Sequence, residues 1–310
     1  MKPMAHHSVL VRVPGKINLQ LSVGPKRSDG YHDIATVFQA VSLADEIRVT
    51  LTDRDGGRDF KIMVNSDHPN AIPTDKSNLA YIAADAMYKK FDLAGGIEIK
   101  IDKKIPVAGG MAGGSANAAG VIVALDSLFS LGLSKDEMQE VGAEIGSDVP
   151  FSIAGGTAVG TGRGERLTPA LTRGQYFWVL ATSSTGLSTP AIYGECDRLR
   201  EGMSISSPQV SEVLMQALST GDAKALGKAL HNDLQAAACS IRPALRLILD
   251  VGMDYGALGG IVSGSGPTVA FLANDEEHAL DLVVALTSSG VVGNVLRASA
   301  PVVGATVIDR

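Results

Sequence analysis

A glycine-rich segment between two regular elements could hold an anion. Residues 106–116 read PVAGGMAGGSA and join a strand-like stretch, 97–101, to a helix-like stretch, 115–128. Glycines lack the Cβ that blocks close approach, consecutive backbone N–H groups can form a concave nest, and a helix N-terminus carries about half a positive charge. This combination favours a phosphate-binding loop. The residues alone leave a merely tight turn as the alternative.

Two other loops are rich in glycine, but none of the three carries a familiar nucleotide fingerprint. Residues 109–114 have the spacing of a P-loop, yet Ser115 stands where that motif needs lysine. The dinucleotide pattern GxGxxG is absent from this loop, from 155–164 and from 259–266. A P-loop NTPase and a nicotinamide- or flavin-dependent Rossmann enzyme are therefore not indicated. The hydroxyl and N–H groups of the last loop could meet an anion, with a plain turn between strands as the alternative, whereas 155–164 can use its glycines for packing alone.

Three polar side chains could act on a bound phosphate or hydroxyl group. Lys16 and Asn18 lie two residues apart in an alternating stretch, so both side chains point to one face of the expected strand. Asp148 follows a helix stop and precedes Pro150, which disfavours helix at the residue between them and helps to fix the turn. A surface lysine and a helix-capping aspartate are the ordinary alternatives for these residue types.

The hydrophobic pattern predicts the elements that must position these residues. Apolar residues at helical spacing predict helices at 77–91, 115–128, 134–146, 210–218, 223–238 and 276–287. Ser134 and Glu137 have the spacing of a capping box. Strands are predicted at 9–23, 97–101, 154–159, 177–181, 260–262, 268–273 and 305–308. Because strands and helices mix without strict βαβ alternation, the pattern favours an α+β fold over a doubly wound sheet, with a domain boundary near residue 160.

Composition argues against several classes of protein. The 27 basic residues are scattered among 33 acidic ones, so there is no basic stripe for nucleic acid. No apolar run approaches the roughly 18 residues of a membrane span, and residues 1–8 contain no signal-peptide core, so we expect a cytoplasmic protein without a membrane partner. Cys196 and Cys239 have no CxxC spacing, and we expect both to be reduced, with a disulfide or metal pair as the alternative. The sequence does not indicate an oligomeric state.

Three segments resemble, in order, the three motifs of the GHMP kinases, the superfamily of galactokinase, homoserine kinase and mevalonate kinase. They are 14–19 (PGKINL), 106–116 and 260–267 (GIVSGSGP), and they span nearly the whole chain. The resemblance implies phosphoryl transfer from ATP to an alcohol. It also implies the two-domain GHMP kinase fold, with an ATP-binding and catalytic domain at 1–160, similar to domain 2 of ribosomal protein S5, and a ferredoxin-like, substrate-side domain at 161–310.

Further segments narrow the resemblance to GHMP kinases whose small-molecule acceptor is a cytidine diphosphate methylerythritol of the non-mevalonate isoprenoid pathway. These are 27–32 (RSDGYH) and 146–151 (GSDVPF), with which 162–165, 188–190 and 231–234 agree. A homoserine- or mevalonate-type kinase, the alternative within the superfamily, gives no reason for Gly30-Tyr31-His32. A non-catalytic nucleotide or sugar-phosphate sensor is a second alternative, against which the retention of Lys16 and Asp148 argues.

The resemblance also implies roles for individual residues. Asp148 is expected to accept the proton of the acceptor's 2-hydroxyl group, and Lys16 to orient Asp148 and stabilise transferred charge, as phosphoryl transfer requires. The residues expected to bind ATP are Pro106, Val107, Ala108, Gly109, Gly110, Met111, Ala112, Gly113, Gly114, Ser115 and Ala116. Those expected to bind the acceptor are Asn18, Tyr31, His32, Thr189 and Tyr193. Mg²⁺ is expected with ATP, Ser115 being its candidate contact, and no carboxylate ligand is assigned.

Overall fold

The computed structural model describes residues 8–53, 57–67 and 71–310. Residues 1–7, on which the expectation about a signal peptide largely rests, lie outside these ranges. Within the described residues, no helix has both the length and the apolar character that crossing a membrane requires.

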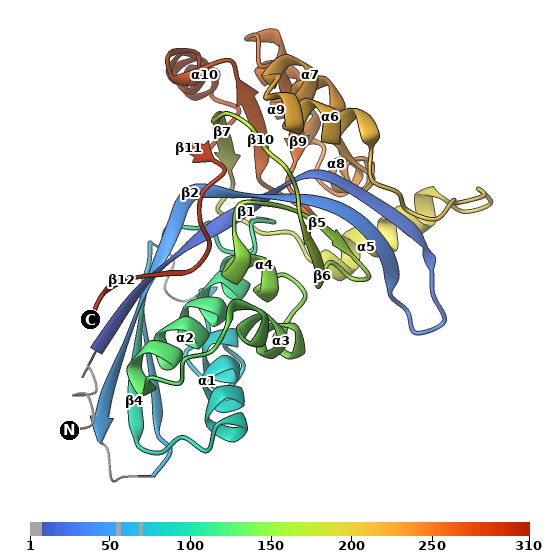
Figure 1. The fold of residues 1–310 in the computed structure, drawn as a ribbon. Coiled ribbons are helices and arrows are strands. Elements are labelled where there is room, and N and C mark those ends of the chain that lie inside the picture. Colours follow the sequence, from blue (N-terminus) through green and yellow to red (C-terminus); the bar gives the residue numbers. More distant parts are fainter. Residues whose placement is uncertain (1–7, 54–56, 68–70) are drawn as a thin grey trace.

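Two long antiparallel strands connect both halves of the molecule. β1 (Ser8–Lys26) and β2 (His32–Asp53) pair along most of their length, with a register shift between Pro14 and Gly15. Figure 1 shows this ribbon, in blue, rising from the lower half of the molecule and passing beneath the upper half to a hairpin turn. The predicted strand 9–23 is confirmed, and Lys16 and Asn18 lie where the ribbon passes between the two halves.

The first sheet has eight strands, and its main path is β12-β1-β2-β4-β3. Its remaining strands extend from this path, because β5 pairs with β2, β6 pairs with β5, and β8 pairs with β1 in parallel. The added elements are β3 (Phe60–Asn65), β4 (Gly96–Asp102), β5 (Thr157–Thr161), β6 (Arg166–Pro169), β8 (His231–Asn232) and β12 (Thr306–Asp309).

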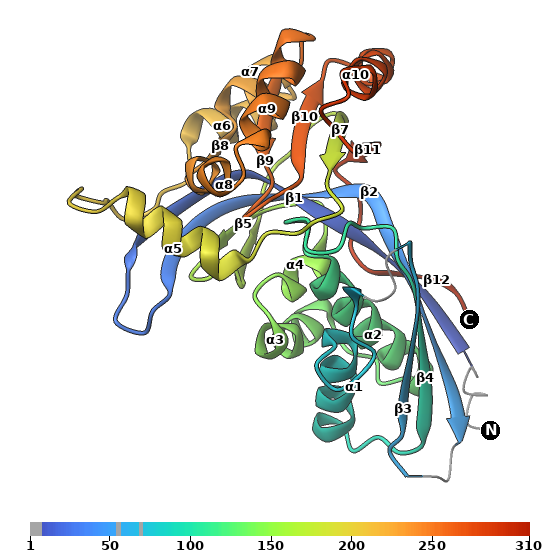
Figure 2. The same ribbon diagram turned by 180° about the vertical axis from the view of Figure 1, so that it is seen from behind.

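Four helices pack on one face of this sheet (Figures 1 and 2). They are α1 (Leu79–Lys90), α2 (Gly113–Phe129), α3 (Lys135–Ile145) and α4 (Val149–Ala154). α2 is central and packs against α1, β1 and α4, so it is buried on almost every side. The predicted capping box of Ser134 and Glu137 begins α3. The result is a rigid support for the glycine-rich loop that leads into α2.

The second sheet has four strands in the order β11-β7-β10-β9. They are β7 (Tyr176–Thr182), β9 (Gly259–Val262), β10 (Val269–Ala273) and β11 (Asn294–Ala300). The helices of this half are α5 (Thr189–Leu199), α6 (Glu212–Thr220), α7 (Ala223–Ala229), α8 (Gln235–Ile241), α9 (Ala244–Asp254) and α10 (Glu276–Ser288). The α+β class predicted from the sequence is confirmed.

The strand pairing does not divide the chain into two separate sheets at residue 160. β6 and β12 both come later in the chain, yet both belong to the first sheet. Gly155 explains part of this return, since a Cβ there would lie 2.0 Å from the backbone nitrogen of Gly304. The glycine-rich loop 155–164 therefore uses Gly155 for close packing against the C-terminal segment. The domain limits 1–160 and 161–310 stay a prediction.

The predicted helix 223–238 is wrong, because the structure breaks it into α7 and α8 around β8. Helical spacing of alanine and leucine suggested one helix, but tertiary contacts decide the middle of the segment. His231 and Asn232 pair in parallel with Gln20 and Leu21 of β1. The buried Asn232 side chain also bonds two backbone carbonyls outside its own segment.

Candidate active site

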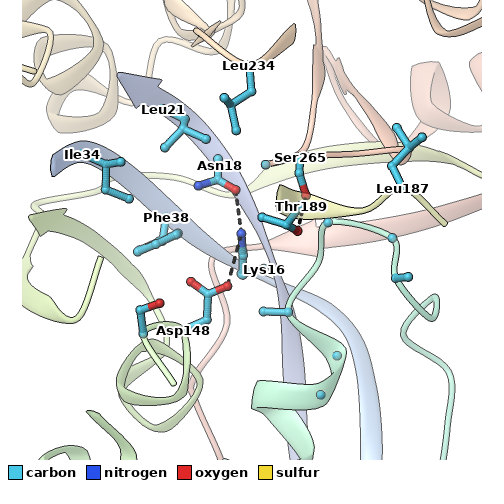
Figure 3. A pocket seen from close by; sticks show the side chains of 18 of the residues that line it. Lys16, Asn18, Leu21, Ile34, Phe38, Asp148, Leu187, Thr189, Leu234 and Ser265 are labelled. Atoms are coloured by element: carbon cyan, nitrogen blue, oxygen red, sulfur yellow. Dashed lines mark hydrogen bonds and ion pairs between the residues drawn. The ribbon is translucent and has the colours of Figure 1, made fainter. Parts of the chain in front are cut away.

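Lys16 is a buried lysine held by three neighbours. Only 6% of the residue is exposed. Its Nζ donates to Asn18 Oδ1 at 2.7 Å, lies 3.8 Å from Asp148 Oδ2, and sits 5.2 Å from the centroid of the Phe38 ring. Figure 3 shows the ammonium between the amide and the carboxylate. The surface-lysine interpretation is therefore wrong, and the period of the strand brings Lys16 and Asn18 together as predicted.

Asn18 is itself fixed by the neighbouring strand. Its Nδ2 donates to Thr36 Oγ1 at 2.8 Å, and the Thr36 hydroxyl donates to the backbone carbonyl of Gln20 at 2.6 Å. Both side chains are buried. Because the amide nitrogen is engaged by Thr36, the Asn18 oxygen is turned toward the Lys16 ammonium.

Asp148 precedes α4, with Pro150 in the first turn of that helix. It occupies the N-cap position, yet its side chain makes no capping hydrogen bond. The carboxylate instead lines a cavity of about 360 Å³ that also contains Lys16 and Asn18, which we call the central cavity. The helix-capping interpretation is therefore wrong, and the carboxylate is available to a bound molecule.

The glycine-rich loop before α2 has the geometry of an anion nest. Ala108, Gly110 and Ala112 have φ angles of 50°, 75° and 58°, so left-handed residues alternate along it. Ala112 is the N-cap of α2 and supplies no side-chain hydrogen bond, which leaves the first N–H groups of the helix without a side-chain cap. The loop is therefore suited to a phosphate, which supplies the oxygen atoms that a cap would otherwise provide.

A second loop, residues 263–268, packs directly against this nest. The Ser263 hydroxyl donates to the Gly110 carbonyl at 3.0 Å, and the Thr268 N–H donates to the Gly109 carbonyl at 3.2 Å. A Cβ on Gly110 would lie 2.1 Å from the Ser263 carbonyl oxygen. Glycine is thus required at this contact by space as well as by backbone angle.

Asp45 connects the two segments that flank the nest, and sequence reasoning missed it. It is completely buried and accepts hydrogen bonds from Lys103 Nζ, from the N–H groups of Lys104 and Ile105, and from Asn117 Nδ2. Burial lowers the pKa of the Lys103 ammonium, although the Asp45 carboxylate opposes this shift. A single aspartate next to an apolar run was the only signal available for this anchor.

Aromatic residues line a cavity of about 520 Å³ beside the central one, which we call the aromatic cavity. The rings of His32 and Tyr193 lie 5.2 Å apart at 34°, and His32 Nε2 is 2.7 Å from Asp197 Oδ1. Tyr31 is 55% exposed at the rim, with the Arg163 guanidinium 5.2 Å from its ring centroid. Burial, reinforced by the Asp148 carboxylate, raises the pKa of Tyr193 to about 12.

Residues of the nest line two of the three cavities, and the aromatic cavity adjoins the central one. The central and aromatic cavities share Ile34, Ser147, Arg163, Thr189 and Tyr193 as lining residues. On the other side of the nest lies a hollow of about 650 Å³, the outer cavity, and Ala108 lines both it and the central cavity. The Thr189 and Ser265 hydroxyls lie 2.9 Å apart and join α5 to the second loop (Figure 3). Lys16 and Asp148 line the central cavity, which shares lining residues with each of the other two cavities.

Comparison with known proteins agrees with this geometry. The family model described as GHMP kinases N terminal domain matches residues 78–156, and that described as GHMP kinases C terminal matches residues 214–292. The chain belongs to the GHMP kinase family. It is therefore a small-molecule kinase, and GHMP kinases use ATP as phosphoryl donor.

Relatives of this GHMP kinase share most of its length. A 4-diphosphocytidyl-2-C-methyl-D-erythritol kinase of Nocardia farcinica is 50% identical over 97% of this chain and 96% of that protein. The enzyme of the same name from Streptomyces avermitilis is 48% identical over 97% of this chain and 100% of that protein. A crystal structure of 4-(cytidine 5'-diphospho)-2C-methyl-D-erythritol kinase superposes with a TM-score of 0.76 at 29% identity, covering 94% of this chain and 99% of the other. A homoserine kinase from Cytophaga hutchinsonii has the same TM-score at 18% identity, which shows the shared fold.

The sequence-predicted residues of this GHMP kinase divide into lining and supporting groups. Eight of the eleven predicted ATP-binding residues line the central or the outer cavity. Met111 and Ala116 are instead completely buried in the core, and Ser115 lines neither cavity. All five predicted acceptor residues line the central or the aromatic cavity. Cys196 and Cys239 are both free and buried, as expected for reduced residues.

Metal binding by protein side chains alone finds little support. Among the described residues, no group of three or more histidines, cysteines, aspartates or glutamates could hold a metal ion. Ser115 is half-buried in the first turn of α2, beside the nest. This donor set fits a Mg²⁺ ion held mainly by phosphate oxygens and water, with a hydroxyl group nearby.

Proposed function

We propose that this chain transfers the γ-phosphoryl group of ATP to the 2-hydroxyl group of 4-diphosphocytidyl-2-C-methyl-D-erythritol, in the cytoplasm, as a step of non-mevalonate isoprenoid precursor synthesis. The names of relatives with about half of their residues identical support the acceptor. The observation that carries the proposal is that the aromatic cavity opens beside Asp148 and shares five lining residues with the central cavity.

The aromatic cavity suits the cytosine base of this acceptor. Tyr31 and Tyr193 offer flat rings for stacking, and His32 offers a polar edge close to them. A base has a polar edge as well as a π-face, so hydrogen bonds from imidazole or backbone groups add selectivity to stacking. Homoserine and mevalonate carry no base, so neither has a group that would stack in the aromatic cavity.

Arg163 lies between the base and the reacting end of the proposed acceptor. It lines both cavities, and among the described residues its guanidinium makes no ion pair, whereas Lys26 in the aromatic cavity is paired with Asp197. A guanidinium suits the diphosphate that links the cytidine to the methylerythritol, because it donates several hydrogen bonds in a fixed plane. We assign it this contact.

ATP approaches the same point from the other side of the nest. The outer cavity is large enough for a nucleoside and is lined by Pro106, Val107 and Ala108, with Lys103 and Lys104 along its wall. A nucleoside there directs its phosphates over the nest and toward the N-terminus of α2. The γ-phosphoryl group then faces Lys16, and the acceptor's hydroxyl group faces Asp148.

In the proposed reaction, the hydroxyl oxygen of the acceptor forms a bond to the γ-phosphorus while the bond to the β,γ-bridging oxygen of ATP breaks. The hydroxyl proton passes to the Asp148 carboxylate, and ADP leaves. Lys16 holds this carboxylate in place and offsets negative charge on the transferred group. Mg²⁺, when bound beside Ser115, supplies further neutralisation of the phosphate oxygens.

A panel of acceptors tests the proposal. Release of ADP is measured with 4-diphosphocytidyl-2-C-methyl-D-erythritol, homoserine, mevalonate and galactose at equal concentrations. We expect turnover with the cytidine diphosphate alcohol alone, and the product is expected to carry its new phosphate on the 2-hydroxyl group by phosphorus NMR. Equal or exclusive turnover of another alcohol would refute the assignment, and tight ATP binding without turnover of any acceptor would favour a sensor.

A further inference from the structure

The segment 231–234 borders the site: Leu234 lines the central cavity, whereas Asn232 lines neither the central, the aromatic nor the outer cavity. The segment forms β8 and the turn into α8, and the Asp233 N–H donates to the Leu21 carbonyl of β1 at 2.9 Å. Asp233 Oδ2 accepts from the Val23 N–H at 2.7 Å and pairs with Arg200 at 2.9 Å. The segment is therefore fixed to the strand that carries Lys16.

Asn232 extends from this fixed segment to the second loop. Only 7% of it is exposed. Its Nδ2 donates to the Val262 carbonyl at 2.7 Å and to the Gly264 carbonyl at 2.8 Å, and its Oδ1 accepts from the Leu234 N–H at 2.8 Å. Both amide hydrogens and the amide oxygen are thus used. Asn232 provides the only donors that the described side chains offer to these two carbonyls.

The loop held in this way contacts both reacting sides of the site. A Cβ on Gly264 would lie 3.2 Å from Asn18 Oδ1 and 3.5 Å from Lys16 Nζ, so the loop backbone passes directly beside them. One residue earlier, Ser263 bonds the Gly110 carbonyl of the nest. A shift of this loop would therefore move the Lys16 surroundings and the nest together.

We infer that Asn232 is a positioning residue for phosphoryl transfer, which holds residues 262–264 against Lys16 and the phosphate nest through its two amide hydrogens. The inference rests on the proposed function where kcat is measured, whereas the affinity for AMP-PNP can be measured independently of the acceptor. It predicts that the donor capacity at position 232, and not merely its volume, sets the rate. A misplacement of about 1 Å away from the chemistry can cost roughly 100-fold in rate.

Asn232→Asp isolates the donors, because it keeps the shape and the oxygen that accepts from Leu234 while it turns a carboxylate oxygen toward two carbonyls. We expect kcat to fall roughly 100-fold at pH 8. We expect the affinity for AMP-PNP to weaken and the affinity for CDP to stay within about twofold, since Asn232 does not line the aromatic cavity. As the pH falls, the introduced carboxyl group can bind a proton and donate one hydrogen bond, so part of kcat should return relative to the wild type.

Gln235→Glu is the matched control. Gln235 Oε1 accepts from the Val262 N–H at 2.9 Å, so a carboxylate keeps this bond while it adds the same charge beside the same strand. We expect little change in kcat or AMP-PNP binding. Asn232→Ser adds no charge, and its shorter side chain cannot donate to both the Val262 and the Gly264 carbonyls. It replaces the aspartate variant if that variant does not fold.

The outcomes separate the two ideas. Failure of the wild type to phosphorylate the cytidine diphosphate acceptor refutes the proposed function, and weakened AMP-PNP binding in the Asn232 variants still supports the positioning role. Wild-type kcat and AMP-PNP affinity in folded Asn232→Asp or Asn232→Ser overturn the inference. An equal loss of CDP and AMP-PNP binding, or a pH profile in Asn232→Asp that parallels the wild type, also overturns it.

Discussion

The Lys16 ammonium lies 3.8 Å from the Asp148 carboxylate, although Lys16 is on β1 and Asp148 is the N-cap residue of α4. Asn18 holds the same ammonium at 2.7 Å, so the lysine is positioned from its own strand before it meets the carboxylate. Two different elements therefore position the two side chains, and we expect the pair to act as a unit.

Asp148→Asn should abolish most of the turnover and keep ATP binding. The amide has the same shape but cannot accept the hydroxyl proton, and loss of a general base typically costs about 10²–10⁴-fold. Lys16→Met should cost a comparable factor, because charge stabilisation and carboxylate orientation are lost together. Steady-state kinetics with both substrates give kcat and the two KM values.

The double variant of Lys16 and Asp148 should be little slower than the worse single variant, since residues that act as a unit are not additive. Additive losses would indicate independent roles. Rates near those of the wild type in either single variant would remove that residue from the mechanism.

Gly110→Ala should weaken ATP binding by more than tenfold. Its φ of 75° costs a side chain about 1–2 kcal/mol, and the new Cβ would collide with the Ser263 carbonyl oxygen 2.1 Å away. The nest must then shift from the phosphates. Isothermal titration with AMP-PNP measures the change.

Gly132→Ala is the control for backbone strain. Gly132 has a φ of 72°, but no atom lies within 4 Å of its ideal Cβ. It should therefore lose stability without losing nucleotide affinity. Equal loss of affinity in both variants would contradict a steric role for Gly110.

Arg163→Met should raise the KM for the acceptor roughly tenfold with a smaller effect on the KM for ATP, because a hydrogen bond to a charged group contributes about 1.5–3 kcal/mol. Inhibition by CDP and by cytidine tests the contact without turnover. The wild type should prefer CDP, and the variant should lose that preference while it still binds cytidine.

Arg166→Met is the matched control on the same hairpin, since the Arg166 side chain is 79% exposed and its guanidinium lies 3.8 Å from Glu165. It should behave like the wild type. An unchanged preference for CDP in Arg163→Met would show that the diphosphate lies elsewhere.

Much of the site was predictable because its signals are local. The period of two in β1 placed Lys16 and Asn18 on one face, and the glycine pattern between a strand and a helix indicated the nest. β2 was missed because residues 34–41 are buried on both faces, so no alternation marks them. Asp45 and Asn232 act through contacts with distant segments, and such contacts leave no periodic signal in the chain.

The pH dependence of stability should report on Asp233, which fixes the segment beside Asn232. Burial alone would raise the pKa of Asp233, but hydrogen bonds from His231, the Val23 N–H and Arg200 outweigh it and lower the pKa to about 2. An aspartate is ordinarily near 3.9, so the ionised form stabilises the fold above about pH 4, and this contribution is lost as the pH falls toward 2. The free energy of unfolding of Asp233→Asn should therefore be about 2 kcal/mol lower than that of the wild type at pH 6, and this difference should shrink below pH 4. Urea unfolding of both proteins between pH 6 and pH 2.5 measures it, and a difference that stays constant across this range would show that the Asp233 charge does not stabilise the segment.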